Sequence, residues 1–274
     1  MTVTNRTANR SPAWLESPDS IAPTVLVLGG FMTAPLMYRG LARRLRDRGA
    51  ADVVVANVWP PDWILAGVRG TGPLTTRSGK ALAEAVRVSG RVSGGAPLLI
   101  VGHSAGGVTG RLLTAPEPFP GRRFGADRLV GAICSLGTPH RLAAGQGIGK
   151  RMNQVAASIA DRVVPGAFFA PRIGYVSVAS RAIRGDPAGN GRERLSYLMY
   201  RSIIGRAAVP GTEGDGLVPV SATDLPGARR VILDDATHSP SSGSSWYGAD
   251  RAVDAWWPVA VEAWRDALAV RARA

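Results

Sequence analysis

Residues 97–113 read PLLIVGHSAGGVTGRLL, and this stretch decides the fold. Its opening, PLLIV, is a short apolar run, which is typical of a buried β-strand. The small residues GHSAG follow at once, and a helix is expected from about Ala105 to Leu113. A strand that turns sharply into a helix predicts one repeating unit of a layered α/β protein.

The same order of strand, turn and helix recurs on both sides of this stretch. Helical spacing of apolar residues follows residue 35 and recurs at about 77–89. Continuous apolar strands separated by helices predict a mostly parallel sheet with both faces covered, so the expected fold class is α/β. The other strands are expected at residues 24–30, 52–59, 127–137, 173–180 and 228–235.

Two later helices complete the pattern. Residues 192–204 carry apolar side chains at i, i+3 and i+4 spacing, which favours a helix over a strand. The last helix has a wide apolar face that includes Trp256, Trp257 and Trp264, with charged residues opposite. We expect these tryptophans to dock the helix on the sheet.

Composition limits the domain organisation and excludes several classes of protein. The chain has 274 residues, of which 45% are hydrophobic and 19% charged, so one large core can form and general disorder is excluded. We expect a single domain over residues 23–272 after a flexible tail at 1–22. Neither a membrane-spanning run nor a signal peptide is recognisable, which predicts a soluble, non-exported, cytoplasmic chain. With only Cys134 and three histidines, neither a disulfide nor a structural zinc site is expected.

The net charge of +13 could indicate binding to nucleic acid or to an anionic membrane. Only Lys80 and Lys150 are lysines, and the arginines are spread along the chain rather than gathered in a run. Such a bias is typical of a GC-rich coding genome, so we expect no nucleic-acid partner. If the charge has a use, we expect transient attraction to anionic lipid surfaces. The sequence makes no prediction of the oligomeric state.

The motif Gly102-His103-Ser104-Ala105-Gly106 has the form G-x-S-x-G and lies between the strand and the helix quoted first. A nucleophilic serine needs such an elbow, because small neighbours permit the strained turn that exposes its hydroxyl. Ser104 is therefore the candidate nucleophile. The alternative is a glycine-rich turn with an incidental serine.

A serine hydroxyl needs a base to take its proton, and the chain offers three histidines. His103 adjoins Ser104, so its side chain is expected to point away from the hydroxyl. His140 follows the next strand, before any plausible acid loop. His238, in the loop after the strand at 228–235, is the candidate base because acid and then base follow the nucleophile on such a sheet.

The acid is expected on a loop between Ser104 and His238. Asp215 is the best candidate, since its flanking glycines let the chain bend and Pro219 stiffens the exit. Asp234 and Asp235 are rivals near His238, although their place at a strand end favours a turn-capping role.

Acyl transfer also needs an oxyanion hole of fixed donors. One donor is expected to be the N–H of Ala105, the residue after the nucleophile. The other is expected from the loop after residues 24–30, with Phe31 as first choice and Met32 as second. The side chains of Phe31 and Met32 would also form the floor of an apolar pocket. The proposed chemistry requires no metal or cofactor.

The ordered set LGGF, GHSAGG, SLGTPH, GDGLVPVSA and ILDDATHSP followed by WYG resembles the α/β-hydrolase superfamily over about residues 23–270. The resemblance is to its lipase-like branch of plant, cyanobacterial and actinobacterial proteins similar to GPI-inositol-deacylase-type esterases. It implies a Ser-His-Asp hydrolase and maps the triad to Ser104, Asp215 and His238. One departure is Gly29-Gly30, where many members have His-Gly.

Members of this superfamily often insert a lid, and residues 141–172 occupy that place in the sequence. This segment holds an amphipathic stretch, Ile148 to Val163, followed by Phe168 and Phe169. The two phenylalanines could line an acyl pocket, face a lipid surface or simply pack in the core. They join Met32 and His103 as candidate pocket residues.

Together these features predict a serine hydrolase that acts, through an acyl-enzyme, on a small-molecule or lipid ester with an apolar acyl group. Thioesterase, phospholipase and acyltransferase activities stay open, because the same triad serves all of them. A non-catalytic membrane-docking or scaffold protein with a decayed site is the remaining alternative.

Overall fold

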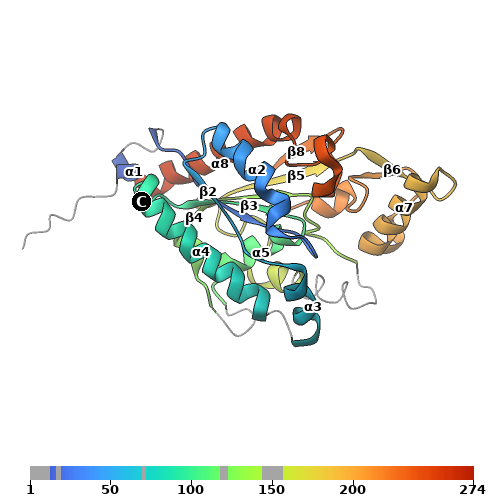
Figure 1. Ribbon diagram of the computed structural model, residues 1–274, viewed down its shortest axis with the longest axis horizontal. Helices are drawn as coiled ribbons and strands as arrows, with labels where there is room; N and C mark the ends of the chain where they lie inside the picture. Colours follow the sequence, from blue (N-terminus) through green and yellow to red (C-terminus); the bar gives the residue numbers. More distant parts are fainter. Residues whose placement is uncertain (1–12, 17–19, 70–71, 118–122, 144–156) are drawn as a thin grey trace, which may run out of the picture.

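The computed structural model describes residues 13–16, 20–69, 72–117, 123–143 and 157–274. Six parallel strands form one sheet in the order β2-β1-β3-β4-β5-β8 (Figure 1), so the predicted α/β class is confirmed. The strands are β1 (Thr24–Leu28), β2 (Asp52–Val55), β3 (Leu98–His103), β4 (Val130–Leu136), β5 (Gly174–Ser180) and β8 (Arg229–Leu233).

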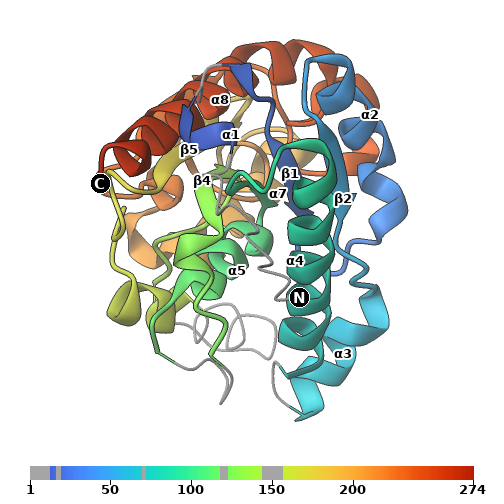
Figure 2. The same ribbon diagram turned by 90° about the vertical axis from the view of Figure 1, so that its left-hand side faces the viewer.

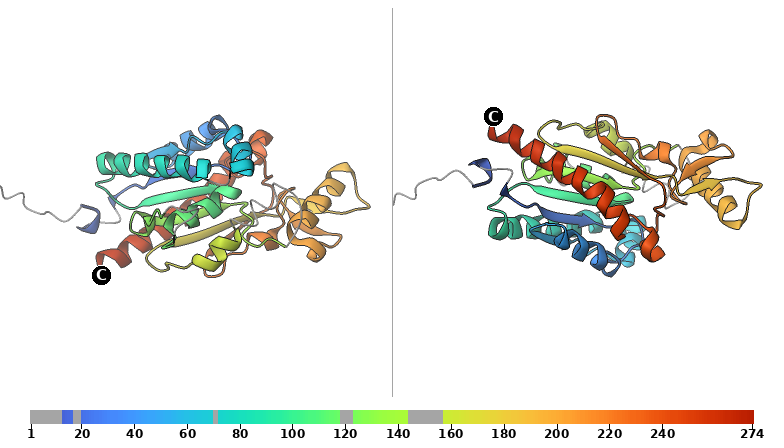
Figure 3. Two further views of the ribbon diagram at one scale, coloured as in Figure 1. Left: turned by 90° about the horizontal axis from the view of Figure 1, so that it is seen from below. Right: turned by 90° about the horizontal axis from the view of Figure 1, so that it is seen from above.

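Helices cover both faces of this sheet (Figures 1 and 3). The alternation of side chains along β1 shows how the layers form: Val25 and Val27 pack in one core cluster and Leu26 and Leu28 in the other. Because both faces are buried, the strand reads as a continuous apolar run. Helices α2 (Arg39–Asp47) and α8 (Asp250–Ala272) cover the first face, and α4 (Gly72–Val92) and α5 (Ala105–Thr114) cover the second.

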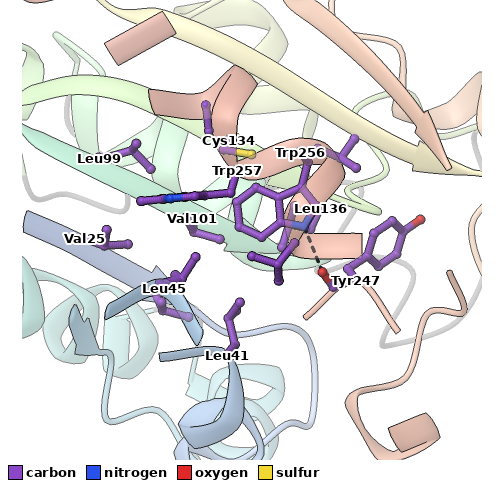
Figure 4. Packing of buried hydrophobic residues seen from close by; sticks show 14 of the residues in the cluster. Val25, Leu41, Leu45, Leu99, Val101, Cys134, Leu136, Tyr247, Trp256 and Trp257 are labelled. Atoms are coloured by element: carbon purple, nitrogen blue, oxygen red, sulfur yellow. Dashed lines mark hydrogen bonds between the residues drawn. The ribbon is translucent and has the colours of Figure 1, made fainter. Parts of the chain in front are cut away.

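The tryptophans of α8 dock the helix on the sheet, as predicted. Trp256 and Trp264 are fully buried, and each indole N–H has a backbone acceptor. Trp256 donates to the carbonyl of Tyr247 at 2.8 Å, and Trp264 donates to that of Pro97 at 2.7 Å. Figure 4 shows Trp256 and Trp257 in the cluster, with the Tyr247 hydroxyl directed away from them.

Part of the predicted tail belongs to the folded domain. Residues 1–12 and 17–19 lie outside the described residues, but Ala13–Glu16 form the short helix α1 beside α8 (Figure 2). Trp14 packs on the core cluster that α8 helps to form. The Trp14 ring is partly buried there, which removes some of its apolar surface from water.

Residues 141–172, predicted as a possible lid, connect β4 to β5. Its residues 144–156 lie outside the described part of the chain. Residues 157–163 are helical, and Ala160 and Val163 pack against Val108 and Leu112 of α5. Because β5 is parallel to β4, the chain must return along the sheet to the amino ends of the strands. That return carries the chain from Arg141, after β4, to Ile173, before β5.

The elaboration at the carboxyl edge comes later, between β5 and β8. Helix α7 (Gly191–Ile204) and the antiparallel pair β6 (Ile183–Gly185) and β7 (Thr212–Gly214) project from the sheet (Figures 1 and 3). The helix was predicted, whereas strands of three residues left no periodic signal.

Shorter elements complete the described structure, in which no helix has the length and apolar character needed to cross a bilayer. They are α3 (Pro60–Arg69), η2 (Pro35–Tyr38), η3 (Ala126–Arg128), η4 (Gly205–Ala207), η5 (Val220–Thr223) and η6 (Pro240–Ser245).

Candidate active site

Ser104 lies at the turn between β3 and α5. Its backbone has φ 53° and ψ −125°, a conformation that side-chain-bearing residues rarely adopt. Such strain costs about 1–3 kcal/mol and persists only where the surroundings enforce it. Here the Ser104 N–H donates to the carbonyl of Leu136 on the next strand at 2.9 Å. The predicted elbow therefore holds Ser104 at the carboxyl edge of the sheet and at the positive end of the α5 dipole.

The glycines of the motif make this elbow possible. A Cβ on Gly102 would lie 2.5 Å from the Cα of Gly107, and a Cβ on Gly106 would overlap the carbonyl of Leu28. At either position the added Cβ would lie well inside van der Waals contact. The G-x-S-x-G spacing thus reflects close packing of α5 on β3 and β1.

Asp215 lies in the loop between β7 and η5 and is 1% exposed. The N–H groups of Leu217 and Val218 donate to its Oδ1 at 3.0 and 2.7 Å. Gly216 has φ +99°, which a residue with a side chain would adopt only with strain. The glycine after Asp215 therefore bends the loop so that backbone N–H groups fold back on the carboxylate.

The structure brings Asp215 and His238 into contact. Their side chains are 2.7 Å apart between Oδ2 and Nδ1, and the His238 N–H donates to the Asp215 carbonyl at 3.0 Å. Burial would raise the pKa of Asp215, but attraction to His238 and the hydrogen bonds to the carboxylate hold that pKa below its usual value. An ionised Asp215 only accepts, so the Nδ1 of His238 carries a proton and Nε2 is left as the basic nitrogen.

Tyr247 is a third member of this group. Its hydroxyl donates to the same Oδ2 of Asp215 at 2.9 Å, and the residue is fully buried. Burial and the neighbouring carboxylate raise the pKa of Tyr247 well above its ordinary value, so the phenol remains a donor. The carboxylate therefore accepts four hydrogen bonds from fixed partners.

Ser104 itself is not hydrogen-bonded through its side chain to any residue that the structure describes. The residue is 8% exposed. His238 nevertheless lies close to the elbow, because its ring is 4.9 Å from that of His103, the neighbour of Ser104. Catalytic hydrogen bonds are often long before substrate binds.

The two predicted oxyanion donors lie on opposite sides of Ser104 in the sequence and close to it in space. A Cβ on Gly30, the residue before Phe31, would lie 2.9 Å from the Cβ of Ser104. The N–H groups of Phe31 and Ala105 have no hydrogen-bond partner within the described residues. Met32 follows with a positive φ of 57° and a side chain 42% exposed.

Tyr38 occupies the space beside Gly29-Gly30, where many members of the superfamily carry His-Gly. A Cβ on Gly29 would lie 2.9 Å from both the Tyr38 ring and the Thr33 hydroxyl. The Gly30 N–H donates to the Tyr38 hydroxyl at 2.9 Å. The loop is therefore held by a tyrosine from η2, which the sequence reasoning missed.

His103 is buried behind the site rather than on the wall of a pocket. It is 1% exposed, and both ring nitrogens contact protein: Nδ1 lies 2.9 Å from the Tyr38 hydroxyl and Nε2 lies 3.0 Å from the His238 carbonyl oxygen. Burial, with a smaller contribution from His238, lowers the pKa of His103 to about 3, so its ring is neutral. It has no surface for a substrate to touch.

Of the three alternatives for Phe168 and Phe169, the structure does not support a pocket beside Ser104. They precede β5, and the Phe169 N–H contacts the hydroxyl of Tyr175 near the amino end of that strand. The two rings meet edge to face, with centroids 4.9 Å apart. Phe169 packs on the core near the end of the sheet opposite to Ser104, whereas Phe168 is 46% exposed.

Apolar side chains near Ser104 come instead from the first part of the chain. The Phe31 ring, 41% exposed, meets the edge of Trp63 of α3 at 5.3 Å. Trp63 forms a small cluster against which Ala105 packs. The apolar floor predicted around Phe31 therefore adjoins the nucleophile elbow.

The rival residues have other partners. Asp234 and Asp235 pair with Arg181 and Arg251, so neither carboxylate serves His238. His140 is buried with its Nδ1 3.2 Å from Arg111, and burial holds the His140 pKa well below its usual value. No cluster of three His, Cys, Asp or Glu side chains in the described parts of the chain could hold a metal ion.

No protein-family model and no curated protein matches this sequence, but solved structures do. The mature lipase BlEst2 of Bacillus licheniformis superposes with a TM-score of 0.60 at 17% identity, covering 89% of this chain and 94% of that one. Its propeptide form gives 0.57 at 14% identity, covering 88% of this chain, which spans 50% of that longer one. The chain has the α/β-hydrolase fold. In an α/β-hydrolase fold the nucleophile, acid and base positions lie at the carboxyl edge, where Ser104, Asp215 and His238 are found.

Proposed function

We propose that the chain is a serine hydrolase that cleaves carboxylic esters with an apolar acyl group through an acyl-enzyme. The observation that carries this proposal is the buried contact between Asp215 and His238, placed beside the strained turn of Ser104. The ordered motifs favour the branch similar to GPI-inositol-deacylase-type esterases. The fold shared with a bacterial lipase is consistent with ester chemistry without fixing the substrate.

In the acylation step, the Ser104 hydroxyl attacks the ester carbonyl carbon while His238 Nε2 takes its proton. Asp215 keeps Nδ1 protonated and stabilises the imidazolium that forms. Collapse of the tetrahedral intermediate breaks the bond to the alcohol oxygen, which leaves with the proton from His238. Water then repeats the sequence on the acyl-enzyme and releases the carboxylic acid and free Ser104.

The negative charge of each tetrahedral intermediate falls on the former carbonyl oxygen. The N–H groups of Phe31 and Ala105 are the donors proposed for it, since neither is used elsewhere within the described residues. Fixed donors at this position contribute a large share of catalysis in acyl transfer, about 10²–10³-fold each. The positive end of α5 acts in the same direction.

The preference for an apolar acyl group rests on the side chains next to the elbow. Phe31 and Met32 are 41% and 42% exposed, and Trp63 backs the Phe31 ring. Exposed aromatic and thioether groups at a site are well suited to bury an alkyl chain. A small-molecule ester or a lipid ester fits this description.

Hydrolysis of p-nitrophenyl esters with acyl chains of two to sixteen carbons tests the proposal. We expect turnover by the wild type, highest on medium or long chains, and loss of turnover in Ser104→Ala. Ser158→Ala, on the exposed side of the helix at residues 157–163, is the matched serine-to-alanine control and should keep wild-type rates. Equal rates for wild type and Ser104→Ala on every ester would refute the proposal.

A fluorophosphonate probe separates an enzyme from a scaffold with a decayed site. It should label wild-type Ser104 and leave folded Ser104→Ala unlabelled. Acyl-thioester and phospholipid substrates in the same assay distinguish thioesterase and phospholipase activity from ester hydrolysis.

A further inference from the structure

The ring of His103 joins two loops of the candidate site. One loop follows β1 and carries Gly30 and Phe31; the other follows β8 and carries His238. Through its two nitrogens His103 contacts the Tyr38 hydroxyl at 2.9 Å and the His238 carbonyl oxygen at 3.0 Å. The proposed steps of ester hydrolysis assign no role to the buried ring of His103.

The contacts of His103 fix which nitrogen carries its proton. A backbone carbonyl only accepts, so the bond to His238 requires a proton on the Nε2 of His103. A neutral ring then has a bare Nδ1 that can only accept from the Tyr38 hydroxyl, whose single proton is shared with the Thr33 oxygen 3.0 Å away. His103 is thus a donor toward the base loop and an acceptor from the oxyanion loop.

Tyr38 carries the connection on to the oxyanion loop. Its oxygen accepts the N–H of Gly30 at 2.9 Å and lies 3.0 Å from the Thr33 hydroxyl. Thr33 in turn donates to the Gly30 carbonyl at 2.8 Å. Both backbone groups of Gly30, the residue before the proposed donor Phe31, are therefore held by this group.

At the other end, almost every polar group of His238 is held. Its N–H donates to the Asp215 carbonyl at 3.0 Å, its Nδ1 meets the Asp215 carboxylate at 2.7 Å, and its carbonyl accepts from His103 at 3.0 Å. Only Nε2 is left to face a substrate or Ser104. The bond from His103 completes the set that orients the base.

The strands that precede these two loops are not direct neighbours in the sheet. β1 and β8 are separated by β3, β4 and β5. His103, the last residue of β3, therefore makes a direct contact between two loops that no strand pairing joins directly. Aromatic rings hold the link in place, since His103 meets Trp246 edge-on at 5.9 Å and lies 4.9 Å from the His238 ring.

We propose that His103 and Tyr38 are positioning residues that set the spacing between the oxyanion donors and the base, an inference that rests on the proposed ester hydrolysis. Both parts must meet one tetrahedral intermediate, so a small shift of one loop lowers kcat. Loss of the link leaves the apolar surface around Phe31 intact, and KM changes little.

Two substitutions of His103 test its contact with the His238 carbonyl separately from its contact with Tyr38. In His103→Gln the amide nitrogen can replace Nε2 and still donate to the His238 carbonyl. In His103→Asn the shorter amide reaches only the place of Nδ1, and the base loop is released. We expect kcat to fall by about tenfold or less in His103→Gln and by about 100-fold in His103→Asn, with KM within about threefold of wild type.

Tyr38→Phe tests the other half, because it removes only the hydroxyl. We expect kcat to fall about tenfold. If one connected link is at work, the double variant Tyr38→Phe/His103→Asn is about as slow as His103→Asn alone, because the link is already broken. Multiplied losses would mean separate structural roles and would overturn the proposal.

Thr24→Val is the structural control. Thr24 is buried and shares a hydrogen bond of 2.9 Å with Ser93 at the amino end of β1, far from the site. We expect a lower melting temperature with unchanged kcat. If His103→Asn shows no more effect on kcat than Thr24→Val at equal loss of stability, the positioning role is wrong.

Nitrogen-15 NMR of the histidine rings gives a readout that needs no activity. We expect His103 to remain neutral with its proton on Nε2 between pH 5 and 8. A proton on Nδ1, or a charged ring in this range, would overturn the link itself. If the wild type shows this tautomer but hydrolyses no ester and takes no fluorophosphonate, the proposed function fails while the link stands.

Discussion

Tyr247 and His238 share one oxygen of Asp215. The phenol donates to Oδ2 at 2.9 Å, and the imidazole Nδ1 lies 2.7 Å from the same atom. The other oxygen is held by two backbone N–H groups of the same loop. The acid is thus fixed on both sides, so its orientation toward His238 does not depend on the substrate.

Asp215→Asn is expected to lower kcat by about 10⁴-fold with little change in KM. The amide can present its NH₂ group to Nδ1, which favours the His238 tautomer with the proton on Nε2, and that tautomer cannot accept the Ser104 proton. Steady-state kinetics on one p-nitrophenyl ester measure the effect. Asp234→Asn is the matched control, because Asp234 pairs with Arg181 on the surface and should keep wild-type rates. Similar losses in both variants would reject Asp215 as the acid.

Tyr247→Phe removes one donor and keeps the packed ring. We expect kcat to fall about 3–10-fold, because a bond to a charged carboxylate is lost while the His238 contact stays. The free energy of unfolding should fall by about 1–2 kcal/mol. Kinetics and urea denaturation on the same preparation check both values. Unchanged kcat and stability would show that Asp215 does not need this donor.

The pKa of Asp215 also predicts how stability depends on pH. His238 and the hydrogen bonds to the carboxylate hold its pKa in the folded protein below the ordinary 3.8 despite burial. The ionised group therefore stabilises the fold fully above that ordinary value, and this contribution is lost as the pH falls through the lower, native pKa. Asp215→Asn should cost about 2 kcal/mol at pH 7 and less at pH 3. A constant difference between the two proteins over this range would contradict the prediction.

Local patterns predicted the scaffold of the site well. The apolar run before Gly102 became β3, and the nucleophile turn and α5 followed where the G-x-S-x-G spacing placed them. The glycine after Asp215 has the backbone angle that its role in a bend requires. These features depend on residues within a few positions of one another, which is why a single sequence reveals them.

Features that depend on contacts distant in sequence were missed. Tyr38 and His103 are 65 residues apart, and Tyr247 meets Asp215 across 32 residues. Tyr247 belongs to the WYG motif that follows His238, but no neighbouring residue in the sequence indicated its contact with Asp215. The sequence left pocket, lipid surface and core open for Phe168 and Phe169, because an apolar pair carries no information about which end of the sheet it reaches.

Gly106→Ala and Gly90→Ala separate packing from helix propensity. A Cβ at Gly106 would overlap the carbonyl of Leu28, whereas one at Gly90 in α4 would meet nothing within 4 Å. We expect Gly106→Ala to lose about 2 kcal/mol or more of stability and most activity. Gly90→Ala should gain up to about 1 kcal/mol, because alanine restricts the unfolded chain. Urea denaturation of both variants gives the comparison, and equal effects would refute the packing argument.

Helix α7 combines exposed leucines with part of the chain's positive charge. Leu195 and Leu198 are 58% and 59% exposed on this projecting helix, and Arg194 and Arg201 lie along the same exposed side. Neither arginine has an acidic partner among the described residues. Arg201 lies over the Tyr197 ring at 5.9 Å, and exposed leucines beside arginines without an acidic partner among the described residues suit the surface of an anionic bilayer.

We therefore expect faster hydrolysis of a lipid ester in vesicles with anionic phospholipid than in zwitterionic vesicles. The advantage should disappear at about 1 M salt, where screening is short-ranged. The double variant Arg194→Gln/Arg201→Gln should reduce the advantage severalfold and leave turnover of a soluble p-nitrophenyl ester unchanged, since no bond joins either arginine to Ser104, Asp215 or His238. Equal rates on both vesicle types, or an advantage that survives in the double variant, would show that α7 does not direct the enzyme to anionic surfaces.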